Sequence, residues 1–231
     1  NEPTAAALDY GIDHMEECNN VLVYDLGGGT LDVTVLEMFE GVLEVKASSG
    51  NNRLGGKDFD NSLMDYCLDS FLSKYGVDVT NDKRAMMRLK KECEKCKIAL
   101  STEQEYGIVL PFFAEVKRKP VSLEEGIERQ LFESLIKPYI DSTREPIQRA
   151  LHDAGLKKED IDLILLVGGS TRIPYVRTFI ETELGKTPGS SLVDPDLTVV
   201  RGASIQAGIL DDKISNEDGI MITDVCPYTL G

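Results

Sequence analysis

The sequence lacks three features that would have placed it in particular classes of protein. No apolar run approaches the roughly 20 residues that a membrane-spanning helix needs. Positive charge is scarce, with 25 Lys and Arg against 40 Asp and Glu and a net charge of −15. This balance argues against nucleic-acid binding, which depends on basic side chains meeting phosphates. The N-terminus has neither an initial Met nor a basic-then-apolar signal pattern.

Cysteine is also scarce, and the five that occur are an odd number at wide spacings. This pattern favours free thiols in a reducing compartment, so we expect a cytoplasmic protein without membrane contact. Cys93 and Cys96 do form a C-x-x-C motif, but there is no second pair and the surroundings are strongly helical. A metal or redox role is therefore the less favoured interpretation.

The length of 231 residues allows one large domain or two smaller ones. Both ends look cut: the chain starts without Met and stops inside an apolar run. We expect it to be a piece of a longer protein. It has no internal repeat and no low-complexity segment.

The most informative stretch is VLVYDLGGGTLD, residues 21–32. Val21–Tyr24 and Leu31–Met38 have the composition of strands, so Gly27–Gly29 form a turn between two strands. The dinucleotide fingerprint and the P-loop both need a helix after the glycines and are excluded. Asp25 and Asp32 flank the turn.

Three residues without a β-carbon let backbone N–H groups converge on an anion. Two carboxylates beside a phosphate would repel it unless a divalent cation lies between them. The hairpin therefore predicts phosphate and Mg²⁺ together. The alternative is a glycine-rich hairpin with two solvated aspartates.

Periodicity and turn residues predict the other elements. We expect a third strand at Val42–Ala47 in an antiparallel meander, a hairpin at Tyr106–Phe113 and Glu115–Val121, and a buried strand at Ile161–Val167. The expected helices are Asn1–Gly11, Asp58–Gly76, Asn81–Thr102, two within Leu123–Ala154 with a boundary near Ser134, Pro174–Leu184 and Leu197–Leu210. Small residues in the last helix allow another element to approach closely.

The helix at Asn81–Thr102 has two distinct faces. One is an apolar stripe of Leu89, Cys93, Cys96 and Leu100, which places both thiols on the packed side. Roughly 120° around the helix lies a second face of Glu94, Lys97, Ile98 and Ser101. That face could hydrogen-bond a ligand, although such a face is by default only solvated.

A second glycine pair, Gly168 and Gly169, lies between the buried strand and a helix. Ser170 or Thr171 could cap that helix, and its N-terminus would accept a ligand's oxygen atoms. Arg172 offers a planar cation that could lie on a purine. The alternative is a simple strand-to-helix turn.

Six segments resemble the 70-kilodalton heat-shock chaperone family of the DnaK type: NEPTAAAL, DLGGGTLD, LGGKDFD, CEKCKIALS, VGGSTRIP and DVCPYTLG. The resemblance runs through essentially the whole chain. It implies an α/β fold, namely the second lobe of an actin-like (ribonuclease H-like) ATPase with a mixed five-stranded sheet and an inserted α+β subdomain. It further implies that 1–54 and 155–218, with part of 133–154, form the core, that 55–154 is the insertion, and that 219–231 begins an interdomain linker.

The resemblance also implies roles for individual residues. Asp25 and Asp32 would hold Mg²⁺ through water, and Glu2 and Thr30 would join them in hydrolysis. The phosphates of ATP or ADP would meet the turn, and the adenosine would meet the second glycine site and the polar helix face. The nucleotide-binding residues are then Gly27, Gly28, Gly29, Thr30, Glu94, Lys97, Ile98, Ser101, Gly168, Gly169, Ser170, Arg172 and Asp196.

The expected partners of such a chaperone are J-domain co-chaperones, nucleotide-exchange factors and, through an absent domain, unfolded client peptides. Departures from the family pattern concern Ile98, where some members carry an arginine, and Lys57, where an acid is usual. Asn52 and Arg53 replace a common Thr-His, and DPDLTVVRG departs from the usual NPDEAVAYG. These changes bear on exchange rate and co-chaperone contacts more than on nucleotide binding.

Two other functions remain open. A heat-shock relative could act as an exchange factor or holdase without cycling, although the linker-like terminal motif speaks against it. A sugar or metabolite kinase of the same fold would need a substrate-binding base, and no residue here suggests one.

Overall fold

The computed structural model describes residues 2–11, 19–39, 42–189, 197–211 and 221–223. The chain divides into two compact units: unit 1 is Asn1–Gly55 with Ile140–Gly231, and unit 2 is Gly56–Tyr139. The α/β class and the mixed sheet agree with the prediction from sequence. None of the helices in the described ranges is long and apolar enough to cross a membrane.

Unit 1 is built on one sheet with the strand order β6-β1-β2-β3-β7. The predicted meander is confirmed, because β1 pairs antiparallel with β2 and β2 with β3. At the edges, β6 is parallel to β1 and β7 is parallel to β3. The strands are β1 (Asn20–Leu26), β2 (Leu31–Phe39), β3 (Val42–Asn51), β6 (Leu163–Val167) and β7 (Met221–Thr223).

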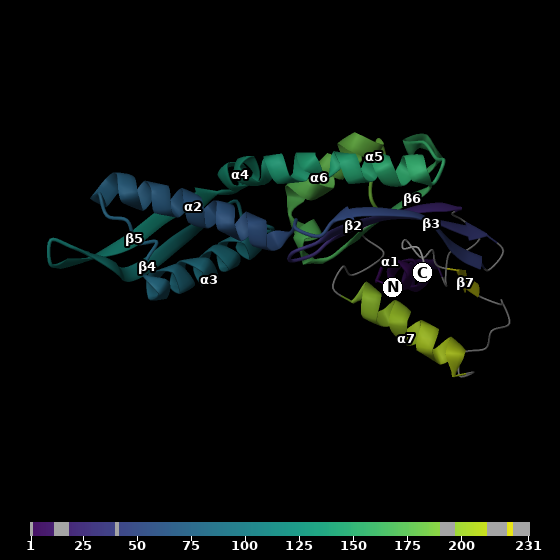
Figure 1. Cartoon of the computed structure of the whole chain (residues 1–231), viewed down its shortest axis with the longest axis horizontal. Helices are drawn as coiled ribbons and strands as arrows, with labels where there is room; N and C mark the ends of the chain where they lie inside the picture. Colours follow the sequence, from purple (N-terminus) through teal and green to yellow (C-terminus); the bar gives the residue numbers. More distant parts are fainter. Residues whose placement is uncertain (1, 12–18, 40–41, 190–196, 212–220, 224–231) are drawn as a thin grey trace, which may run out of the picture. The chain divides into compact units, whose positions relative to one another are not determined.

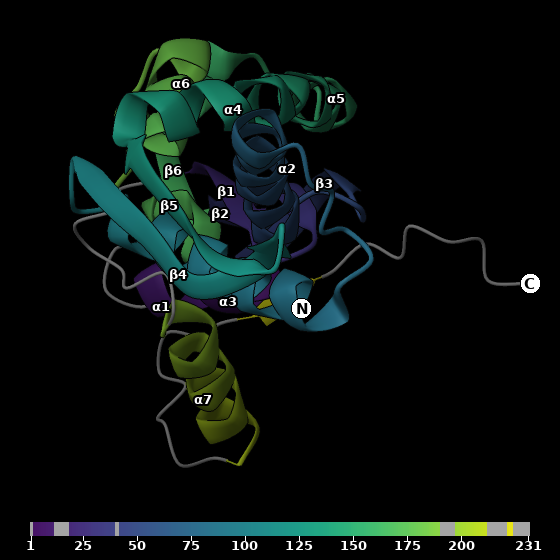
Figure 2. The ribbon, with the colours of Figure 1, turned by 90° about the vertical axis from the view of Figure 1, so that its left-hand side faces the viewer.

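Helices cover both faces of this sheet, so its central strands are apolar on both sides. Figure 1 shows α5 (Arg144–Asp153) and α6 (Pro174–Leu184) on one face, with α1 (Glu2–Gly11) and α7 (Thr198–Leu210) on the other. The same layering is visible from the side in Figure 2. Every residue of β6 is buried, as its continuous apolar run predicts.

The last helix, α7, packs closely on α1, as its small residues predict. A β-carbon added at Gly202 would overlap the backbone of Ala5. Thr198, fully buried at the start of α7, donates a hydrogen bond to Asp9 Oδ2 over 2.8 Å.

Unit 2 combines α2 (Gly56–Tyr75) and α3 (Lys83–Ala99) with a two-stranded sheet of β4 (Glu105–Val116) and β5 (Lys119–Glu128). Asp82 caps α3 by accepting hydrogen bonds from the backbone N–H groups of Arg84 and Ala85. The predicted apolar stripe of α3 is confirmed, and its thiols are buried with Cys67 of α2. A hydrogen bond with the Cys67 thiol, together with burial, raises the pKa of Cys93, and burial raises that of Cys96 to about 12.

The sequence prediction was wrong at the tip of this hairpin. We expected a turn near residue 114, but β4 continues to Val116 and the turn falls at Lys117 and Arg118. Both residues have a positive φ, which long side chains seldom adopt, so their sequence gave no sign of this turn. A register shift between Leu110 and Ala114 also lengthens β4.

The boundary between the two following helices was also misplaced. Residues 123–128, which we expected to be helical, belong to β5, because Leu123 and Ile127 are buried in its pairing with β4. The first helix, α4, is Arg129–Ser142, and it ends at Thr143 rather than near Ser134. Thr143 is buried and its hydroxyl donates to the Ile140 carbonyl, so a side-chain contact ends the helix without a glycine.

Candidate functional site

The two aspartates that flank the glycine turn are direct partners across the β1–β2 ladder. Asp25 is only 8% exposed. Burial, followed by the negative charges of Glu2 and Asp32, raises the pKa of Asp25 to about 6. Burial and the charge of Glu2 likewise raise the pKa of Asp32. The structure thus brings together three carboxylates, including Glu2, that the sequence analysis had assigned to the site.

The turn between these aspartates is closed by one backbone hydrogen bond, from Gly27 N–H to the Thr30 carbonyl over 3.0 Å. At Gly27 and Gly28 the backbone φ lies outside the left-handed region, so chain conformation does not require glycine there. A β-carbon at Gly28 would meet no atom within 4 Å. The bare backbone therefore leaves open space beside the acids, which a ligand atom can use.

Two further glycines, Gly50 and Gly55, pack closely against this turn and its acids. The sequence analysis assigned no role to either. A β-carbon at Gly55 would collide with the backbone of Gly28 and Gly29, and one at Gly50 would lie 3.1 Å from Asp32 Oδ1. Gly55 belongs to LGGKDFD and Gly50 to the segment before it. Their contacts with the turn are distant in sequence, so no local pattern predicts them.

The second glycine site adjoins the first within unit 1. Ser170 Oγ donates a hydrogen bond to the Gly27 carbonyl over 2.9 Å. Gly168 has a φ of +84°, and a β-carbon there would lie 2.8 Å from Asp25 Oδ1. The two glycine turns that the sequence analysis combined into one site are therefore in direct contact.

The predicted capping of α6 by Ser170 or Thr171 is wrong. The residues Gly169–Arg172 form a 3₁₀ helix, and Ile173 precedes α6 without a side-chain capping bond. Both hydroxyls are used elsewhere: Ser170 binds the Gly27 carbonyl, and Thr171 donates to the Gly168 carbonyl over 2.7 Å. Arg172 and Gly169 are exposed at this end of unit 1.

The predicted nucleotide-binding face of α3 belongs to unit 2. Glu94 is exposed, Ser101 is partly exposed, and Ile98 is exposed to 63% despite its apolar side chain. Lys97 is held by an ion pair with Asp60 of α2. Asp196, the remaining predicted contact, lies outside the described residues, as does most of the predicted linker 219–231.

The acids around the turn suit a metal ion that keeps its bound water. In the part of the chain that the structure describes, no three His, Cys, Asp or Glu side chains are arranged to coordinate a metal directly. Mg²⁺ often keeps its water shell and takes only one or two carboxylates besides substrate phosphates. The paired aspartates fit that kind of water-mediated contact.

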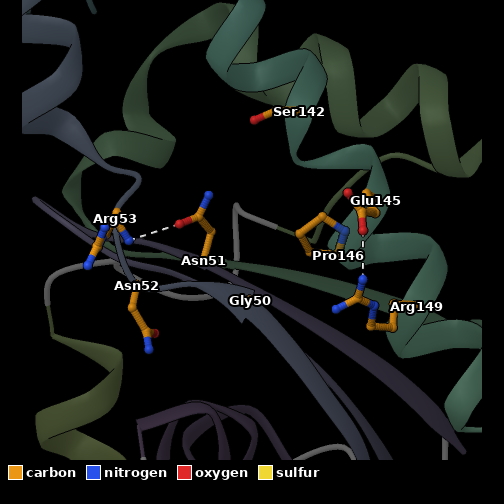
Figure 3. A pocket seen from close by; sticks show the side chains of 8 residues that line it. All are labelled: Gly50, Asn51, Asn52, Arg53, Ser142, Glu145, Pro146 and Arg149. Carbon is orange, nitrogen blue, oxygen red and sulfur yellow. Dashed lines mark hydrogen bonds and ion pairs between the residues drawn. The ribbon is translucent and has the colours of Figure 1, made fainter.

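A pocket of about 410 Å³ lies between the end of β3 and the start of α5, and its lining includes neither Asp25 nor Asp32. Figure 3 shows Glu145 paired with Arg149 on one side of the pocket and Asn51 bonded to the backbone of Arg53 on the other. Its lining is Gly50, Asn51, Asn52, Arg53, Ser142, Glu145, Pro146 and Arg149.

Fold and site together define an α/β protein whose mixed sheet carries two acids around a glycine turn. The model of the family described as Hsp70 protein matches residues 1–231. The chaperone protein DnaK of Thermotoga petrophila is 50% identical over 234 residues, and that of Thermosipho melanesiensis is 48% identical over 233 residues. The chain belongs to the Hsp70 family. Both alignments cover 100% of this chain and 39% of the relative's length.

Proposed function

We propose that this chain is the nucleotide-binding second lobe of an ATP-dependent chaperone with an actin-like ATPase fold. In the whole protein it binds ATP or ADP with Mg²⁺ and couples hydrolysis to the binding and release of peptides. The observation that supports this most strongly is the contact between the two glycine turns, with Ser170 tied to the Gly27 carbonyl beside Asp25.

The charges at the turn support the pairing of a polyphosphate with a cation. A positive charge would stabilise the ionised forms of Asp25 and Asp32, because burial and the charge of Glu2 raise the pKa of both carboxyls. The bound cation would neutralise the phosphate tail, while the Gly27–Thr30 backbone meets its oxygens. Glu2 and Thr30 then assist the attack of water, in a reaction that depends mainly on positioning.

The resemblance assigns the adenosine end to Glu94, Lys97 and Ile98 of α3, to Ser101 just after that helix, and to Gly168, Gly169, Ser170, Arg172 and Asp196. The division into core 1–54 and 155–218, insertion 55–154 and linker 219–231 stays a prediction. So do the cytoplasmic location and the absence of nucleic-acid and membrane partners.

The chain spans about two fifths of the length of the curated relatives it matches, 39% in each case. Client peptides, J-domain co-chaperones and exchange factors are therefore proposed as partners of the whole protein. The chain by itself is expected to bind ADP or ATP weakly and to show no significant turnover, because the resemblance places other phosphate contacts in a first lobe.

The test is calorimetric titration of the full-length protein with ADP, with and without Mg²⁺, and an assay of peptide-stimulated ATP hydrolysis. Asp25→Asn is expected to lose the metal-dependent part of the activity. Thr30→Val should slow hydrolysis more than it weakens binding. Asp153→Asn, which changes an exposed carboxylate away from the turn, is the matched control. Wild-type behaviour of both site variants would refute the assignment.

A further inference from the structure

The pocket between the end of β3 and the start of α5 has no role in the proposed function. Its volume of about 410 Å³ is within the range of small-molecule sites. All of its lining residues belong to unit 1, so one compact unit forms the pocket alone. Two of them, Asn52 and Arg53, are departures from the family pattern to which the proposed function assigns nothing.

The composition of the lining indicates a charged ligand. Apart from Gly50 and Pro146, every lining residue is polar or charged, so the pocket does not suit an apolar molecule. The charged residues are two arginines and Glu145, which leaves a positive balance. In a chain whose net charge is −15, such a pocket favours a negatively charged ligand.

Asn51 presents hydrogen-bond donors to this pocket. Its Oδ1 accepts the backbone N–H of Arg53 over 2.9 Å. Only the amide oxygen can accept that hydrogen bond, so the NH₂ group lies on the other side of the amide. Figure 3 shows this nitrogen directed away from Arg53. The amide therefore offers N–H groups to a ligand.

Arg149 supplies a cation across the pocket from Asn51, as Figure 3 shows. Its Nη2 donates a hydrogen bond to Glu145 Oε1 over 2.6 Å. Both side chains of this pair are more than half exposed, so the ion pair contributes little stability. A guanidinium has five N–H donors in a planar fork, and the fork matches two oxygens of a carboxylate or phosphate.

Donors therefore outnumber acceptors among the lining side chains. Arg53 adds a second guanidinium to the wall that carries Asn51. Glu145 is the one acid of the lining, and its charge is already paired with Arg149. A ligand with several acceptor oxygens and negative charge complements this set.

We propose that this pocket binds a small polyanion whose carboxylate or phosphate oxygens accept hydrogen bonds from the Asn51 amide and from the guanidinium groups of Arg149 and Arg53. This inference goes beyond the proposed function, because the pocket contains neither the acids of the turn nor any residue assigned to the nucleotide.

The experiment is calorimetric titration of the full-length protein with pyrophosphate and, separately, with citrate, which carry the two kinds of oxyanion group. Divalent ions are removed first, so that the acids of the turn repel both probes. The wild type is expected to bind at least one probe with a Kd of about 1 mM or below. The tighter probe identifies the preferred group, and the absence of saturable binding of either probe below about 10 mM would overturn the proposal.

The lining variants should change Kd in opposite directions. Arg149→Met removes the guanidinium fork and should raise Kd about fivefold or more. Asn51→Asp keeps an oxygen for the Arg53 N–H but replaces the NH₂ group by a charged oxygen, so it should raise Kd about tenfold or more. Glu145→Gln removes the acid that competes for Arg149 and should lower Kd about threefold.

Arg201→Met is the matched control. Arg201 is an exposed arginine of α7, on the other face of the unit 1 sheet, and it does not line the pocket. Its Kd should stay within about twofold of the wild-type value at fixed ionic strength. Equal weakening in Arg201→Met and Arg149→Met would mean attraction by overall charge alone and would overturn the proposal, as would an unchanged Kd in Arg149→Met.

All four substituted residues are exposed, so the variants are expected to fold, and their melting temperatures check this. If Asn51→Asp does not fold, Arg149→Met and Glu145→Gln decide the test. A lower Kd in Glu145→Gln supports the proposal, because loss of structure does not tighten binding. An unchanged or higher Kd in folded Glu145→Gln contradicts it.

Discussion

The close contact of Gly168 with Asp25 and Leu26 can be tested against Gly155, because both glycines have a positive φ. Gly168 has φ 84° and ψ 144°, a region that is almost exclusive to glycine. Gly155 has a φ of +71°, but a β-carbon there would meet nothing within 4 Å. Substitution by alanine therefore adds backbone strain at both positions and a steric clash only at Gly168.

The two substitutions differ in how much free energy of unfolding they remove. At Gly155, left-handed strain costs about 1–2 kcal/mol and is partly offset by about 0.4–1 kcal/mol from the stiffer unfolded chain. At Gly168, strain of about 1–3 kcal/mol adds to overpacking of about 1–3 kcal/mol. The overpacking arises because the new β-carbon would lie 2.5 Å from the Leu26 carbonyl oxygen and 2.8 Å from Asp25 Oδ1.

Gly168→Ala should thus be less stable than Gly155→Ala by about 2 kcal/mol or more. It should also bind Mg²⁺–ADP more weakly, because the clash moves the Asp25 carboxylate. Thermal unfolding of the full-length protein and calorimetric titration measure the two effects. Equal stability of the two variants, or unchanged affinity in Gly168→Ala, would refute the reasoning from this contact.

Two further predictions follow from the same unit. The raised pKa of Asp25, about 6, means that the native chain binds this proton more tightly than the unfolded chain. This group should therefore make the ligand-free protein less stable as pH rises from about 4 to about 6. The binding of Mg²⁺–ADP near pH 6 should also release a proton, and Asp25→Asn should not release it. Calorimetric titration in buffers of different ionisation enthalpy measures this release. Gly202→Ala should lower the melting temperature because its β-carbon would overlap the backbone of Ala5, although alanine favours a helix over glycine by about 1 kcal/mol. Ser204→Ala on the exposed side of α7 is the control. A higher melting temperature in Gly202→Ala would contradict this packing of α7 on α1.

Local patterns were sufficient for most of the core of unit 1. The apolar run Val21–Tyr24 and the alternation in Leu31–Met38 predicted β1 and β2. A strand buried on both faces is continuously apolar, and one buried on a single face alternates, so both patterns can be read from the sequence. The glycine turn and its two aspartates were found in the same way, since turn, strands and acids are contiguous. The structure then showed that Asp25 and Asp32 are ladder partners.

Features that depend on distant contacts could not be found in this way. Nothing near Gly55 in sequence shows that it packs on the turn at Gly28, and nothing near Asp60 shows that it pairs with Lys97. Ser170 is instructive, because a hydroxyl before a helix usually caps it. Here the better acceptor is the Gly27 carbonyl, 143 positions earlier in the chain, and α6 begins without a capping side chain.

The carboxylate turn also links ligand binding to stability. Glu2, Asp25 and Asp32 repel one another in the ligand-free chain, and burial raises the cost of charging Asp25 and Asp32. The backbones of Asp25 and Asp32 are paired in the ladder, and the backbones of Gly168 and Gly50 lie close beside their carboxylates. A cation brought in with a polyphosphate removes the repulsion only in the native state, because the unfolded chain does not hold these acids together. If the proposed function holds, ligand binding should raise the stability of unit 1 by mass action, and more strongly than contacts to the turn alone would.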